Sequence, residues 1–61
     1  MPLTNKELIA IEDALSHEQL LVKKFRNHAA CAQDPAIKQK AEALADRHKQ
    51  HFNTLMSHLN K

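Results

Sequence analysis

The sequence predicts an all-α fold in which two antiparallel helices form a hairpin. Its 61 residues include no glycine and only two prolines, whereas tight β-turns favour glycine. Apolar residues recur at alternating spacings of three and four, the period of a helix that packs against other helices. The only internal breaker is Gln33-Asp34-Pro35. A short connection of this kind joins two helices of similar length into an antiparallel pair.

Length and composition restrict the classes of protein to consider. Residues 1–61 are at most one domain, and a chain this small needs a disulfide, a metal or self-association to stabilise its fold. The single cysteine cannot form an internal disulfide. A net charge of +2, with one short basic cluster at residues 23–26, does not indicate a nucleic-acid partner. No apolar run would span a membrane or form a signal-peptide core, so we expect a cytoplasmic protein.

The first helix is expected over about residues 5–32. Thr4 is the predicted N-cap, and Glu7, three residues later, completes a capping box. The apolar stripe of this helix is interrupted once, by Glu18, at a position where the pattern requires an apolar residue. The stripe is wider than contact with one partner helix needs, which is typical of a helix inside a bundle.

The second helix is expected over about residues 35–59. Asp34 is a good N-cap, and Pro35 suits the first helical position. The inward-facing stripe of this helix is apolar near the turn and becomes polar in its middle, at His48 and His51. The second helix therefore also carries polar residues where a core residue is expected.

The hairpin geometry brings these interruptions together. With the turn at Gln33 and Asp34, Glu18 lies level with Lys49, whose inward neighbours are His48 and His51. The i, i+3 spacing of the two histidines places them on one side of the helix. One carboxylate and two imidazoles are ordinary ligands of zinc, iron, manganese or copper. The sequence thus predicts Glu18, His48 and His51 as a candidate metal site.

Two alternatives remain open at this stage. The same three residues could form a metal-free polar layer, since buried polar groups in bundles also fix register and oligomeric state. They could instead lie exposed at the surface. His17 and His28 lie off the main stripe and are expected at the surface. The sequence contains no phosphate loop, nucleophile elbow or Cys-x-x-Cys motif, so no catalytic residue is predicted.

Three stretches together resemble half of a rubrerythrin-type ferritin-like domain. They are the apolar run that leads into Glu18, the turn at residues 33–38, and residues 44–51, which read Leu-Ala-Asp-Arg-His-Lys-Gln-His. The chain is also similar, more loosely, to short ferritin-like, spore-coat-like proteins of spore-forming bacteria. The resemblance implies that two such hairpins form a four-helix bundle around a metal site.

The resemblance assigns roles to individual residues. Glu18 matches the carboxylate of the family's first helix, and His51 matches the histidine of its Glu-x-x-His motif. His48 stands where the family has a bridging glutamate. A neutral imidazole does not bridge two irons as a carboxylate does, so di-iron oxidase chemistry is disfavoured, and a redox or oxidase enzyme is the least favoured of the functions that remain open. Mononuclear binding of iron, zinc or manganese, or a pair of sites in a dimer, remains compatible with these ligands.

A symmetric homodimer would supply the missing half of the bundle. It would double the layer to two copies each of Glu18, His48 and His51, and it would cover the wide apolar face. The alternative function is a structural or interaction module, such as a spore-coat subunit that contacts other coat-assembly proteins. The layer would then only specify register, and the protein would be located in the spore coat.

Overall fold

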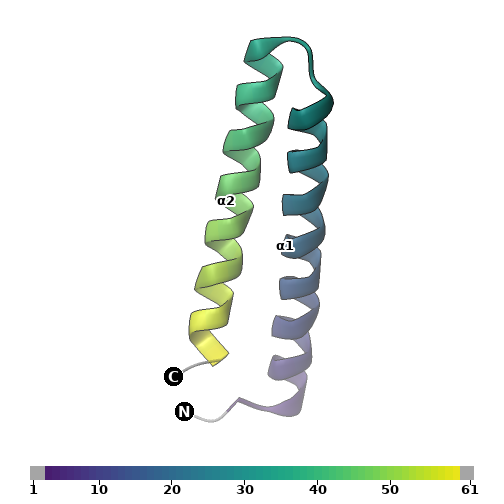
Figure 1. Ribbon diagram of the computed structural model, residues 1–61. Coiled ribbons are helices and arrows are strands. Elements are labelled where there is room, and N and C mark those ends of the chain that lie inside the picture. Colours follow the sequence, from purple (N-terminus) through teal and green to yellow (C-terminus); the bar gives the residue numbers. More distant parts are fainter. Residues whose placement is uncertain (1–2, 60–61) are drawn as a thin grey trace.

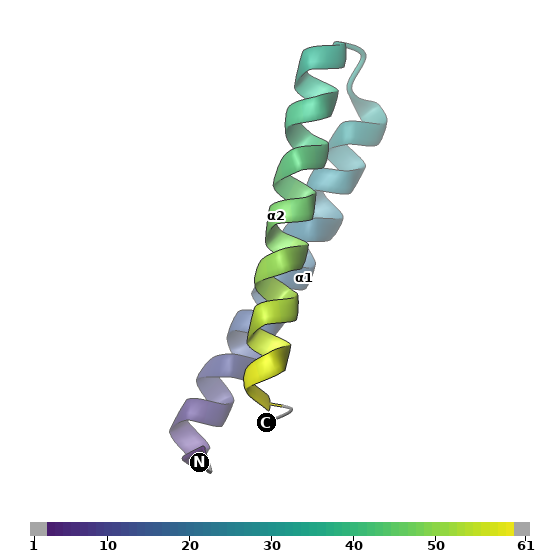
Figure 2. The same ribbon diagram turned by 90° about the vertical axis from the view of Figure 1, so that its left-hand side faces the viewer.

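Two long helices joined by a short turn make up the computed structural model, which describes residues 3–59 (Figure 1). Helix α1 spans Asn5–Cys31 and helix α2 spans Pro35–Leu59. The helices run antiparallel, so the start of α1 and the end of α2 lie at the same end of the hairpin, opposite the turn. The second view shows that they cross at a shallow angle (Figure 2). Residues 3–59 include no strand, and the predicted all-α hairpin is confirmed.

The capping box at the start of α1 forms as predicted. The hydroxyl of Thr4 accepts a hydrogen bond from the backbone N–H of Glu7 at 3.1 Å. In return, Oε1 of Glu7 accepts one from the backbone N–H of Thr4 at 3.0 Å. The pKa of the Glu7 carboxyl group is lowered below its usual value of 4.5, first by the hydrogen bond from the Thr4 backbone and second by hydrogen bonding to the Thr4 side chain. These contacts satisfy donors that the first turn of a helix leaves free.

The turn is held by hydrogen bonds on both sides. Helix α1 ends at Cys31, one residue before its expected end, because Ala32 adopts extended backbone angles, with its N–H still donating to the carbonyl of His28. At the start of α2, Oδ1 of Asp34 accepts a hydrogen bond from the N–H of Ala36 at 2.8 Å. Asp34 is therefore the N-cap that the sequence indicates, with Pro35 in the first helical position.

The contact between the helices is built on small side chains. Among the described residues only Ala29, Ala41 and Ala45 are buried, and all three lie in the half of the hairpin near the turn. The hairpin is elongated, with extents of 47 × 16 × 10 Å. Its accessible surface is 5027 Å², whereas a compact monomer of 7.0 kDa exposes about 4,000 Å². The single hairpin thus leaves roughly 1,000 Å² more surface in water than a compact fold of its mass would.

Within residues 3–59, neither helix has a stretch long and apolar enough to cross a membrane.

Candidate metal site

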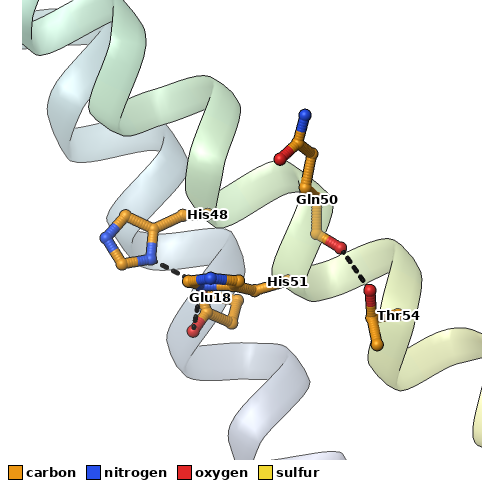
Figure 3. A network of polar contacts seen from close by, with 5 residues as sticks. All are labelled: Glu18, His48, Gln50, His51 and Thr54. Atoms are coloured by element: carbon orange, nitrogen blue, oxygen red, sulfur yellow. Dashed lines mark hydrogen bonds and ion pairs between the residues drawn. The ribbon is translucent and has the colours of Figure 1, made fainter.

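Glu18, His48 and His51 converge between the two helices, as the sequence predicts (Figure 3). Glu18 is the central residue of α1, and the two histidines lie one turn apart near the middle of α2. The side chains of Gln50 and Thr54 lie apart from this group in the same view. The interruptions of the two apolar stripes therefore form one layer at mid-length of the hairpin.

The carboxylate of Glu18 directs one oxygen toward each histidine. Its Oε2 lies 2.7 Å from Nδ1 of His48, a short distance that is typical of a charge-assisted hydrogen bond. Since an ionised carboxylate only accepts, the ring nitrogen is the donor. Its Oε1 lies 3.7 Å from Nδ1 of His51, which is too long for a hydrogen bond and leaves His51 without a firm partner in this group.

The layer is buried unevenly. The side chains of Glu18 and His48 are 16% and 20% exposed, whereas that of His51 is 52% exposed. Glu18 and His48 are therefore held in the seam between the helices, and His51 opens the layer to one side of the hairpin. The alternative in which all three residues lie exposed at the surface does not hold for Glu18 and His48.

The ring of His48 packs against Phe25 of α1 in addition to its contact with Glu18. The two rings are stacked, with centroids 5.7 Å apart and planes inclined by 2°, and the ring of His51 meets that of His48 edge-on at 5.4 Å. By its distance from the turn along the chain, Phe25 is level with Ala41 and Glu42 rather than with His48. Helical side chains lean toward the N-terminus of their own helix, so those of Phe25 and His48 lean toward each other in an antiparallel pair. This lean, in addition to the level of each residue, brings the two rings together.

The three side chains have the chemistry of a metal site. One ligand atom from each residue lies within 4.8 Å of the others. Ligand bonds of about 2.0–2.2 Å place the donor atoms of tetrahedral zinc roughly 3.4 Å apart, so small side-chain rotations would close the set around an ion. Three protein ligands leave the remaining coordination positions for water or for another group. Equally, the Glu18–His48 hydrogen bond satisfies both partners without an ion.

Other candidate ligands lie elsewhere. His17 and His28 are exposed, which confirms their expected surface placement. Glu12 and Glu42 are exposed too, and within residues 3–59 no other group of three histidine, cysteine or acidic side chains gathers closely enough to hold a metal. Cys31 is exposed at the end of α1. The candidate site thus consists of the three residues that the sequence indicates, with Phe25 as its packing partner.

Comparison with known proteins adds no relative: no family model matches the chain, and comparisons with curated proteins and with solved structures give no match.

Proposed function

We propose that this protein is a small, ferritin-like metal-binding protein in which two hairpins associate into a four-helix bundle. The observation that carries the proposal is that a carboxylate of α1 and two imidazoles of α2 have ligand atoms within 4.8 Å of one another. Each of them replaces an apolar residue in a stripe that otherwise follows the helical period, and a metal site explains all three replacements at once. The bound ion is a divalent transition metal such as zinc, iron or manganese.

The exposed surface supports association. The excess of roughly 1,000 Å² per hairpin corresponds to about 2,000 Å² for a pair, which is within the range of specific, stable interfaces. One side of the hairpin, here called the histidine face, suits such a contact because four of its five residues are apolar and half-buried, and the fifth, His51, is exposed. The histidine face consists of Leu21, Phe25, Leu44, His51 and Leu55.

The position of the layer also supports a symmetric pair. Glu18 is the central residue of α1, and His48 is next to the central residue of α2. A layer at mid-length meets its own copy whether the second hairpin runs parallel or antiparallel to the first, provided that the two pair over their full length. The parallel arrangement also places the two His51 side chains at one level, where each could complete the coordination of the other's ion.

Metal uptake by matched variants tests the site. Purified protein is freed of metal and titrated with Zn²⁺, and the affinity is compared for the parent, Glu18→Gln, His51→Ala and His28→Ala. Loss of a ligand is expected to weaken binding at least about tenfold, since even groups that only orient ligands cost about that much. His28→Ala also removes an imidazole, but from an exposed position outside the layer, so its affinity should stay unchanged. Equal affinities for His51→Ala and His28→Ala would contradict the site.

The dimer has its own test. Because Ala29, Ala41 and Ala45 are the only buried side chains among residues 3–59, folding should depend on association, and dilution should reduce helicity as the dimer dissociates. Sedimentation combined with circular dichroism over a range of protein concentrations measures both quantities. A compact, fully helical monomer at micromolar concentration would refute the four-helix bundle.

A structural role without metal is the second candidate. Ile9 and Leu20 are 59% and 66% exposed on α1, and their positions around the helix point away from α2. A four-helix bundle formed through the histidine face would leave both in water, which favours a further layer of assembly, such as that of a coat subunit. This role predicts that purified protein carries no stoichiometric metal and that its oligomers persist after treatment with a chelator.

A further inference from the structure

A basic groove runs along the seam between the helices, on the opposite side from the histidine face. Its volume is about 430 Å³, and its lining includes the apolar side chains of Val22 and Phe52 and the cationic side chains of Lys23, Arg26 and Lys49. The volume is within the range of small-molecule sites, about 300–1,000 Å³. Val22 and Phe52 are half-buried, so they form the floor, and the three exposed cations form the walls.

The helical period separates this groove from the metal site. His51 and Phe52 are adjacent in sequence and therefore point about 100° apart around α2. His51 follows Leu44 by two turns and shares its side of the helix, while Phe52 turns toward Val22. A second hairpin on the histidine face would thus leave the basic groove open to solvent. Binding in the groove does not depend on the proposed metal site.

The charged side chains that line the groove are all positive. Lys23, Arg26 and Lys49 supply three positive charges, and no acidic residue is part of the lining. The whole chain has a net charge of +2, so the rest of the molecule sums to −1 by difference (2 − 3). Helical side chains lean toward the N-terminus of their own helix, which inclines Arg26 on α1 and Lys49 on α2 toward each other. The groove therefore favours a compact anion of more than one charge.

The remaining lining residues favour an organic anion over a free inorganic one. The apolar floor carries an aromatic ring, Phe52, against which a flat ring could pack. The amides of Gln19 and Asn27 also line the groove and offer both donors and acceptors to the edge of such a ring. A phosphate group held by lysine and arginine and attached to a planar heterocycle satisfies all three kinds of surface.

We infer that the basic groove binds a mononucleotide-like phosphate ester, with the phosphate between Lys23, Arg26 and Lys49 and the base against Phe52. The ligand class follows from three cations without an acid, an apolar aromatic floor and two flanking amides in a space of suitable size.

Titration of the isotope-labelled 61-residue protein with adenosine monophosphate, monitored by amide NMR spectra, tests this inference. Saturable shifts are expected at the lining residues, and adenosine and inorganic phosphate should each bind more weakly than the nucleotide. The variant Arg26→Gln/Lys49→Gln should weaken binding about tenfold, as expected for the loss of two charge-assisted contacts that are partly screened by water.

The matched control is Lys6→Gln/Lys24→Gln, which removes the same charge from two exposed positions outside the groove. It should change the affinity less than about twofold, since neither side chain lines the groove and exposed charges are screened by water and salt. Circular dichroism confirms that both double variants fold. The inference is overturned if the shifts do not saturate, if both double variants weaken binding equally, or if inorganic phosphate binds as tightly as the nucleotide. Saturation of the protein with Zn²⁺ should leave nucleotide affinity unchanged, which keeps this result separate from that of the metal site.

Discussion

The half of the hairpin near the turn and the half beyond the Glu18 layer differ in how they are held. Near the turn, Ala29, Ala41 and Ala45 are buried, because small side chains let two helix backbones approach closely. Beyond the layer, no described residue is buried, and Leu8 is 37% exposed. The first half is thus closed by the chain's own contacts, whereas the second half presents larger apolar side chains that a single hairpin cannot cover.

A larger side chain at the close contact between the helices near the turn should have the largest effect on stability. Ala45→Leu places a larger side chain where the residue is 1% exposed, and overpacking of this kind costs about 1–3 kcal/mol. The free energy of unfolding, measured by denaturation at a fixed protein concentration, should fall by that amount. Ala43→Leu makes the same change at an exposed position and should stay within about 0.5 kcal/mol of the parent. Equal effects of the two substitutions would show that the helices do not meet at Ala45.

Removal of the N-cap should have a smaller effect, concentrated in the open half. Thr4→Ala deletes the hydroxyl that accepts from the N–H of Glu7 and should cost about 1 kcal/mol, with faster amide exchange in the first turn of α1. Thr54→Ala is the matched control. The hydroxyl of Thr54 donates to the carbonyl of Gln50 within α2, and alanine has the higher helix propensity, so this variant should be as stable as the parent or slightly more stable.

Acid should weaken the same end of the hairpin by the smallest amount. Because the folded-state pKa of Glu7 is lowered from 4.5, its contribution to stability is fully present above that value and is lost as the pH falls through the lowered pKa. The protection of the first-turn amides, relative to an unstructured amide at the same pH, should therefore decrease in this acidic range. Glu7→Gln removes the titrating group, so a variant with the same acid dependence would contradict the assignment to Glu7.

The sequence was sufficient to predict the local structure because the determining signals are local. Thr4 with Glu7 predicts the start of α1, and Asp34 with Pro35 predicts the start of α2, since each pair satisfies free donors within a few residues. The candidate site was predictable for a related reason. Interruptions of an otherwise regular stripe identify Glu18 and the two histidines, and the antiparallel turn fixes which interruptions share a level.

Features that depend on side-chain direction and on surface shape were not predicted. The stacking of Phe25 on His48 requires the lean of both side chains as well as their levels. The basic groove combines residues of both helices that belong to no common sequence pattern, so it forms only when the helices pack together. The proposed contact of the histidine face with a second hairpin likewise depends on how two surfaces fit together, which no spacing along one chain specifies.

The start of α1 and the end of α2 lie at the same end of the hairpin, so a covalent fusion of two copies can show how two hairpins are arranged. If one copy were fused head-to-tail to another, parallel copies would need only a short linker, because the end of α2 in the first copy and the start of α1 in the second would lie at the same end of the bundle. Antiparallel copies would need a linker that spans the 47 Å length of the molecule, or at least about 14 extended residues. The shortest linker that still permits an intramolecular bundle would therefore distinguish the two topologies.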